Sequence, residues 1–233
     1  MNEIQQKIIW DHFQTSELSV FAGAHPRLTS LAKQVPNGGR ILNVGIGDGF
    51  LEARALLRGA EVYSLDPSED AVKKLAASMG DPDSDHFKDG FVESMPFPKD
   101  FFDVVVMSEV LEHLGDESLS QALQEVHRVL KPGGKFIGTV PAEEDLSLNL
   151  VLCPCCETKF HRWGHQQSFT RERFGMVLEL NFVGVSVQRA YFLDLKNYSW
   201  KGKLLALAKL CVCRFGKGGT NENWQFVARK RAN

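Results

Sequence analysis

The stretch that decides the fold is RILNVGIGDGF, residues 40–50, in which a short apolar strand runs directly into a glycine-rich loop. Helical and extended patterns then alternate along the chain. A second predicted strand, residues 61–65, is followed by Asp66, and residues 102–107 have the continuous hydrophobicity of a strand buried on both faces. This alternation with short loops predicts a parallel sheet covered by helices on both sides.

The same patterns predict the remaining elements and one domain over residues 1–233. We expect helices at 2–13, 25–35, 51–58, 69–79 and 119–130, and further strands at 86–92, 135–140, 182–188 and 225–228. We expect four parts: an N-terminal helical lid (1–36), a cofactor-binding core (37–141), a Cys/His insert (142–170), and a C-terminal part with a helix, strands and a basic apolar segment (171–233).

Composition excludes several classes of protein. The chain has 233 residues with 27 basic and 29 acidic side chains, a balance that argues against a nucleic-acid partner. No apolar run approaches the roughly 18 residues of a spanning helix, and the N-terminus lacks a secretory signal pattern. We therefore expect a cytoplasmic protein whose five cysteines are reduced thiols or metal ligands.

The glycine loop and the acid after the second strand point to an adenosyl ligand. Glycines at 45, 47 and 49 allow close backbone approach, and the helix that follows offers free N–H groups. The spacing is G-x-G-x-G, with Phe50 where a dinucleotide fingerprint has its third glycine. Asp66 stands where a carboxylate accepts hydrogen bonds from a ribose diol, or alternatively where it caps the next helix.

Four segments carry a family resemblance: ILNVGIGDGF, EVYSLDPS, FVESMPFPKDFFDVVVMSEVLEHL and EVHRVLKPGGKFIGTVP. Their order and spacing over residues 40–141 resemble the class I S-adenosylmethionine-dependent methyltransferases. The resemblance implies an α/β, Rossmann-like three-layer sandwich. Its mostly parallel sheet of seven strands would have the order 3-2-1-4-5-7-6, with the last strand antiparallel. It also implies S-adenosyl-L-methionine as cofactor.

The resemblance also implies which residues hold the cofactor. The glycines would lie under its methionine part, Asp66 would bind the ribose hydroxyls, and Ser108 would line the methyl-transfer end. Asn43 and Phe91 stand where the family usually has acids, so Asn43 keeps a hydrogen-bonding oxygen without the charge and Phe91 can only pack or stack. The full set implied is Asn43, Gly45, Gly47, Gly49, Asp66, Pro67, Phe91, Val92 and Ser108.

Residues 142–170 contain a candidate metal site. Cys153 and Cys156 form a C-x-x-C pair, and His161 and His165 follow it, so two thiolates and two imidazoles would suit a structural Zn²⁺ ion. Other interpretations stay open. Cys155 would replace one neighbour, the pair of cysteines at 211 and 213 would complete a four-cysteine site, or the thiols are free or redox-active.

His165 also has a competing role. The segment GHQQSFT, residues 164–170, resembles one that many of these methyltransferases place over the substrate, with Thr170 capping the next helix. A neutral imidazole beside the methyl acceptor would act as a general base, and His113 in EVLEHL is the other candidate.

The sequence therefore predicts a methyltransferase that acts on an O, N, C or S nucleophile of a small or lipid- or saccharide-like acceptor. A basic, apolar segment at 200–217 would contact anionic membrane surfaces or pack on the sheet edge. Two alternatives remain: a non-catalytic zinc-knuckle binding module on a Rossmann-like scaffold, and a nicotinamide-dependent oxidoreductase. The oligomeric state is not encoded in any pattern that we find.

Overall fold

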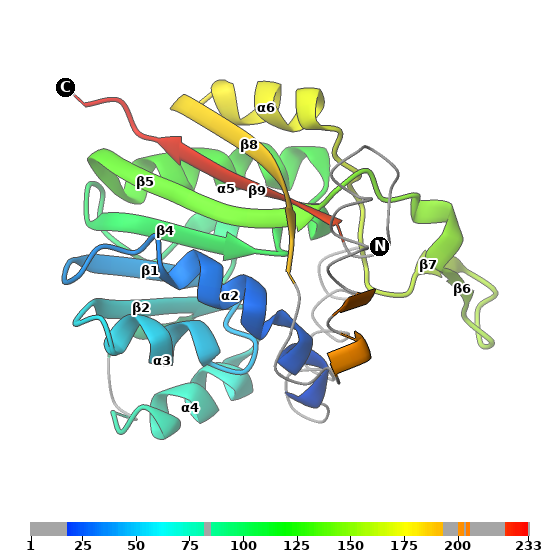
Figure 1. The fold of residues 1–233 in the computed structure, drawn as a ribbon, viewed down its shortest axis with the longest axis horizontal. Helices are drawn as coiled ribbons and strands as arrows, with labels where there is room; N and C mark the ends of the chain where they lie inside the picture. The colour runs from blue at the N-terminus through cyan, green and yellow to red at the C-terminus, as the bar shows by residue number, and fades with distance from the viewer. Residues whose placement is uncertain (1–17, 82–84, 193–199, 203, 206–221, 233) are drawn as a thin grey trace.

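The computed structural model describes residues 18–81, 85–192, 200–202, 204–205 and 222–232. Its main sheet has the order β3-β2-β1-β4-β5-β9-β8 (Figure 1). Counted along the chain within this sheet, that order is 3-2-1-4-5-7-6, as expected. Strands β1 to β5 are parallel, and β9 is antiparallel to both of its neighbours, β5 and β8. The strands are β1 (Arg40–Val44), β2 (Glu61–Asp66), β3 (Phe87–Asp89), β4 (Phe102–Ser108), β5 (Leu130–Pro141), β8 (Val183–Tyr191) and β9 (Glu222–Arg229).

Short polar residues start two of the helices. Ser68 accepts a hydrogen bond from the backbone N–H of Ala71 at the start of α4, and Thr170 accepts one from Arg173 at the start of α6. The cap at Thr170 is the one that the sequence predicts. The helices are η1 (Leu18–Ala24), α2 (His25–Ala32), α3 (Phe50–Leu56), α4 (Glu69–Ser78), α5 (Asp116–Val129) and α6 (Arg171–Glu179), with short 3-10 turns η2 (Val92–Ser94), η3 (Leu111–His113) and η4 (Leu146–Asn149).

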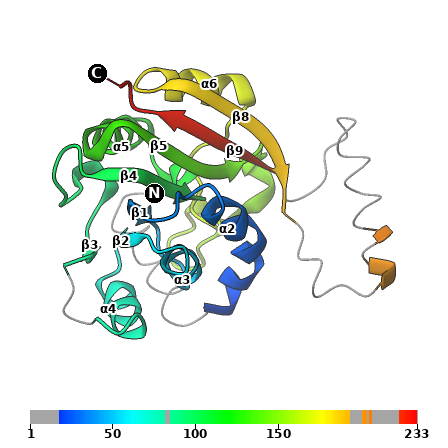
Figure 2. The same ribbon diagram turned by 60° about the vertical axis from the view of Figure 1, so that its left-hand side comes forward.

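The helices cover both faces of the sheet (Figure 2). Along β4, Val105 and Met107 face the core cluster that contains α5, whereas Val104 and Val106 face the cluster that contains α2 and α3. This period of two, with apolar side chains on both faces, is the signature of a strand buried inside a three-layer sandwich. The ligand-binding edge is therefore the one at which the parallel strands end.

Three expectations about the elements need correction. The helix expected at 25–35 ends at Ala32, and the strand expected at 86–92 is only Phe87–Asp89, because the chain then leaves the sheet and forms η2. Residues 142–170 contain a hairpin that the sequence did not predict, formed by β6 (Leu150–Leu152) and β7 (Lys159–His161). In Figure 1 this hairpin stands out beyond the sheet on the side where β4 ends.

Other expectations fall outside the described residues. These are the helix at 2–13, the cysteines at 211 and 213, and most of the basic apolar segment at 200–217. Within the part of the chain that the structure describes, no helix is both long and apolar enough to cross a membrane.

Candidate functional site

A cavity of about 560 Å³ opens at the carboxyl ends of β1, β2 and β4. Eight of the nine residues that the resemblance assigns to the cofactor line it; Gly49 is the exception. Both candidate catalytic residues, His113 and His165, line it as well. The strand ends thus bring together residues from position 43 to position 165, as the topology of a parallel sheet predicts.

The first two glycines of the loop shape the cavity wall. Gly45 has φ +82°, and a Cβ on it would lie 2.8 Å from Val110 Cγ2. Gly47 has φ +55° and lies against the ring of Phe21. Both backbones therefore approach the cavity without a side chain in the way. Phe21 belongs to the expected N-terminal lid, whose other aromatic residues lie outside the described chain.

The third glycine serves packing. Gly49 has φ +78° and precedes the first residue of α3, and a Cβ there would lie 2.6 Å from Leu75 Cδ1 on α4. Gly49 thus has a structural role, since it lets α4 pack closely against the loop, and its expected place under the cofactor stays a prediction.

Asp66 is a buried carboxylate that ties two segments together. Its Oδ2 accepts the backbone N–H of Ile46 at 3.0 Å, and its Oδ1 accepts that of Ser68 at 2.9 Å. Ser68, and not Asp66, supplies the side-chain cap of α4. Asp66 lines the cavity while it holds the glycine loop against the end of β2.

Asn43 is hydrogen-bonded to a buried acid on the following helix. Asn43 Nδ2 donates to Glu52 Oε1 at 2.7 Å, and Ser64 Oγ donates to the same oxygen at 2.9 Å. Burial raises the pKa of the Glu52 carboxyl to about 7. No role was predicted for Glu52. The sequence signal for its burial is that it shares a helix with the apolar residues Leu51 and Ala55, which are buried with it in α3.

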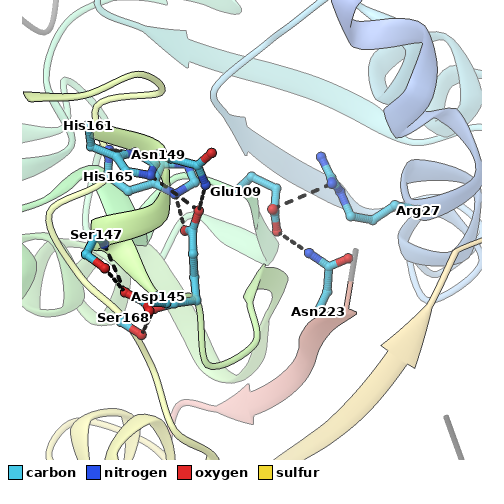
Figure 3. A network of polar contacts seen from close by, with 10 residues as sticks. Arg27, Glu109, Asp145, Ser147, Asn149, His161, His165, Ser168 and Asn223 are labelled. Atoms are coloured by element: carbon cyan, nitrogen blue, oxygen red, sulfur yellow. Dashed lines mark hydrogen bonds and ion pairs between the residues drawn. The ribbon is translucent and has the colours of Figure 1, made fainter. Parts of the chain in front are cut away.

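Polar side chains also surround the end of β4 (Figure 3). Arg27 Nε donates to Ser108 Oγ at 2.9 Å, and Arg27 Nη1 lies 3.7 Å from Glu109 Oε2. Asn223 Nδ2, on β9, donates to Glu109 Oε1 at 3.0 Å. Glu109 has φ +58°, an uncommon conformation for a residue with a side chain, and such strain gathers at functional sites. Neither Arg27 nor Glu109 is among the site residues expected from the sequence.

Beyond Glu109 lies a group that we call the histidine cluster, which consists of Glu112, His113, Glu144, His161 and His165. His165 Nδ1 lies 2.5 Å from Glu144 Oε2. The ring of His161 stacks on that of His165 with centroids 4.6 Å apart, and His113 meets His165 edge-on at 4.7 Å. Figure 3 shows the two histidines of the insert side by side.

Burial sets the protonation of this cluster. Desolvation, with the nearby Glu109 carboxylate, raises the pKa of Glu112 well above its usual range. Burial, with repulsion from His165, lowers the pKa of His113 to about 3. Burial opposes ionisation of Glu144, but the hydrogen bond with His165 prevails and lowers its pKa. His113 is therefore neutral and only weakly basic at pH 7, which argues against a role as general base.

Backbone hydrogen bonds fasten the end of the insert to η3. The N–H groups of Gln166 and Gln167 donate to the carbonyl oxygen of Glu112 at 2.7 and 2.9 Å. Gln166 Nε2 donates to the carbonyl oxygen of His113 at 2.7 Å. These bonds fix His165 over η3, so the cluster is assembled by the fold rather than by chance proximity of mobile side chains.

The expected two-cysteine, two-histidine zinc site is not formed. Among the described residues, His161 and His165 share metal-ligand groups with carboxylates and with His113, and none of these groups contains Cys153 or Cys156. The cysteines lie in the turn between β6 and β7, where Cys156 Sγ contacts Thr158 Oγ1 at 3.3 Å. That hydrogen bond lowers the pKa of the Cys156 thiol.

Comparison with known proteins agrees with the resemblance seen in the sequence. Residues 42–138 match the family model described as methyltransferase domain. This match covers less than half of the chain. It runs from β1 into β5 and carries the glycine loop, Asp66 and the residues of η3. The resemblance to the class I S-adenosylmethionine-dependent methyltransferases is thereby confirmed, as is the Rossmann-like fold.

Three similar proteins illustrate the extent of the likeness. An uncharacterised methyltransferase from a Geobacillus species is 31% identical over 118 residues, 51% of this chain and 54% of that protein. A putative methyltransferase from Haloferax volcanii, solved in complex with the activator Trm112, has TM-score 0.66 and 19% identity over 95% of this chain and 97% of its own.

The third is phosphoethanolamine N-methyltransferase 2 of Haemonchus contortus, in complex with phosphomonomethylethanolamine and S-adenosylhomocysteine. It has TM-score 0.66 and 17% identity, and the likeness covers 98% of this chain and 60% of that one. At these identities the two structures show the shared fold. The chain spans about half the length of the first curated relatives that it matches.

Proposed function

We propose that the protein is an S-adenosylmethionine-dependent methyltransferase that acts on a small acceptor. The observation that carries the proposal is the cavity of about 560 Å³ that joins the cofactor residues to the histidine cluster. One end of the cavity has the glycine loop and Asp66, and the other has His113 and His165. Such a cavity would hold donor and acceptor in line, which is the main requirement of a transfer by proximity.

The cofactor residues suit an adenosyl and methionine ligand. Gly45 and Gly47 leave a cradle that side chains would fill, and Asp66 offers a fixed carboxylate beside it. The two hydrogen bonds of Asn43 both use its Nδ2, so its carbonyl oxygen remains for the cofactor's amino group. Phe91, with 45% of its surface exposed, offers a face for stacking on the adenine. S-adenosylmethionine, when bound, supplies the activated methyl group.

The other end of the cavity would receive the acceptor. His165 is held by Glu144 at its Nδ1, so its Nε2 is the nitrogen that it presents to a ligand. Glu109 and Arg27 lie between the two ends and would orient polar groups of the acceptor. The acceptor atom, whether O, N, C or S, is left to the assay of methyl transfer.

Titration calorimetry with S-adenosylmethionine and S-adenosylhomocysteine is the first test. We expect one-to-one binding of both, with micromolar affinity on the order of that of other small cofactors. A radiolabelled methyl donor, offered with panels of hydroxylated, amino and thiol acceptors, then identifies the substrate. Absence of binding at millimolar ligand would contradict the proposal and favour a binding module. Binding of a nicotinamide dinucleotide instead would favour an oxidoreductase.

A further inference from the structure

The most unusual group in the described part of the molecule is the carboxyl of Glu112. Its side chain is 0% exposed, and neither of its oxygens has a hydrogen-bond partner among the described residues. A buried carboxyl without partners costs several kcal/mol unless it is neutralised by a proton or a cation. One ligand atom each from Glu112, His113 and His165 lie within 4.8 Å of one another. The orphaned carboxyl therefore faces two imidazoles.

A second grouping shares His165 but suits a cation less well. It consists of Glu144, His161 and His165. The backbone N–H of His165 donates to His161 Nδ1 at 3.2 Å, so the proton of a neutral His161 is on Nε2. That nitrogen lies 3.4 Å from Glu144 Oε1 but makes no hydrogen bond among the described residues, and it carries a proton where a metal ligand needs a lone pair. Glu144 and His161 each hold His165, one at its ring and the other at its backbone N–H.

We infer that Glu112, His113 and His165 form a binding site for a divalent transition-metal ion at the acceptor end of the cavity. The three side chains bring their ligand atoms together without any change of the fold. His165 contributes Nε2, because Nδ1 is held by Glu144, and a carboxylate behind a metal-binding histidine is the usual way to fix its ring. Two imidazoles and one carboxylate suit Zn²⁺, Mn²⁺ or Fe²⁺ and leave coordination positions open.

The open positions give the site a role that rests on the proposed function. His113 and His165 line the cavity, so an ion between them would meet the acceptor. A metal-bound hydroxyl has a lowered pKa and loses its proton to solvent at neutral pH. The inference therefore selects acceptors that carry a hydroxyl group, such as alcohols, phenols and sugars, and it removes the need for a protein general base.

Binding of Co²⁺ to chelator-treated protein tests the site without an assay of activity. Calorimetry and the visible absorption spectrum are recorded together, since thiolate ligands add an intense near-ultraviolet charge-transfer band. We expect one equivalent of Co²⁺ with no such band. Glu112→Gln and His165→Ala should weaken binding by about 100-fold or more, and Glu144→Gln by about tenfold.

Two controls separate this site from its neighbours. His161→Gln, which keeps an acceptor for the His165 N–H, and the double variant Cys153→Ser/Cys156→Ser should bind Co²⁺ within about threefold of the unmodified protein. Loss of binding in the cysteine variant, with the band present in the unmodified protein, would place the ion in the hairpin and overturn the inference. Loss of Co²⁺ binding in His161→Gln, with binding retained in Glu112→Gln, would place the ion in the Glu144 grouping. That result would also overturn the inference.

Thermal unfolding guards against misfolded variants. Without metal, Glu112→Gln should unfold at a temperature no lower than the unmodified protein, because the amide keeps the shape of a buried carboxyl that has no hydrogen-bond partner among the described residues. With Co²⁺, the unmodified protein should gain stability and Glu112→Gln should not. No metal-induced gain in the unmodified protein would contradict the site. Retained binding of S-adenosylhomocysteine in that case would leave the methyltransferase proposal standing, so the two failures are distinguishable.

Discussion

The two ends of the cavity are built in different ways. At the cofactor end, which consists of the glycine loop, Asp66 and Phe91, backbone conformation shapes the wall, and Asp66 bonds to two backbone N–H groups. At the histidine cluster, side chains from three separated segments meet, and the Glu112 carboxyl has no hydrogen-bond partner among the described residues. The difference teaches that local hydrogen bonds hold the first end, whereas the second end contains a buried polar group that the ion inferred above would partner.

The largest expected effect at the cofactor end comes from Asp66→Ala. The substitution removes a charged acceptor of the ligand's hydroxyls and leaves the N–H groups of Ile46 and Ser68 unpaired. We expect the affinity for S-adenosylhomocysteine to fall by about 100-fold or more, because charge-assisted hydrogen bonds contribute roughly 1.5–3 kcal/mol each. Calorimetry measures it, and Asp66→Asn, which keeps one acceptor, should fall between. Unchanged affinity would show that this end is not the cofactor site.

Glu52→Gln tests the buried acid behind the cofactor end. The carboxyl has its ordinary pKa of 4.5 when unfolded and about 7 when folded, so the folded state binds more protons between these values. Stability therefore falls as pH rises through that window, by about 3 kcal/mol, and stays lower above it. Urea unfolding at pH 5 and pH 8 should show a loss of stability that is smaller by about this amount in the variant than in the unmodified protein, because other buried groups such as Glu112 titrate in both. Parallel profiles for both proteins would refute the assignment.

Gly49→Ala separates packing from cofactor binding. The left-handed backbone and the contact with Leu75 should cost about 1–2 kcal/mol of stability, while the affinity for S-adenosylhomocysteine changes little. Gly175→Ala is the matched control, because Gly175 lies in α6 with open space around it, and alanine there should add about 0.5–1 kcal/mol. Denaturant unfolding of both variants gives the comparison, and equal shifts would argue against the packing role.

Phe91→Ala has the smallest expected effect. Loss of one stacking face should weaken binding of S-adenosylhomocysteine about fivefold, or about 1 kcal/mol, without lowering stability. Leu57→Ala is a suitable control because Leu57 is 80% exposed and does not line the cavity. If Phe91→Ala binds like the unmodified protein, the adenine edge is recognised by backbone groups alone.

The sheet and the cofactor end could be predicted from the sequence because their signals are local. A strand, a glycine loop and an acid follow one another between positions 40 and 66, and the backbone geometry follows from those residue types. The packing role of Gly49 could not be predicted, because a glycine that admits a ligand and one that admits a neighbouring helix have the same appearance in sequence. The contact with Leu75 on α4 is long-range, and no local pattern shows it.

The histidine cluster was predicted only in part. The spacing of Cys153 and Cys156 suggested that their partners were the nearest histidines, but His165 instead faces Glu144 and His113, which lie 21 and 52 positions away in the sequence. Long-range contacts of this kind are set by how the insert returns across η3. Glu112 belongs to the EVLEHL motif but had no predicted role, because nothing in the sequence indicates that its carboxyl is buried without a hydrogen-bond partner among the described residues.

The place of β9 in the sheet has a consequence for the order of events during synthesis. This strand is the last of the sheet along the chain, yet it lies between β5 and β8 and brings Asn223 to Glu109, 114 positions earlier. As the chain leaves the ribosome, the residues that line the cavity emerge long before β9. Until β9 arrives, β5 and β8 each present an open edge to other chains. The nascent protein therefore has an interval in which its binding motifs have been made while two unpaired strand edges favour association with other chains.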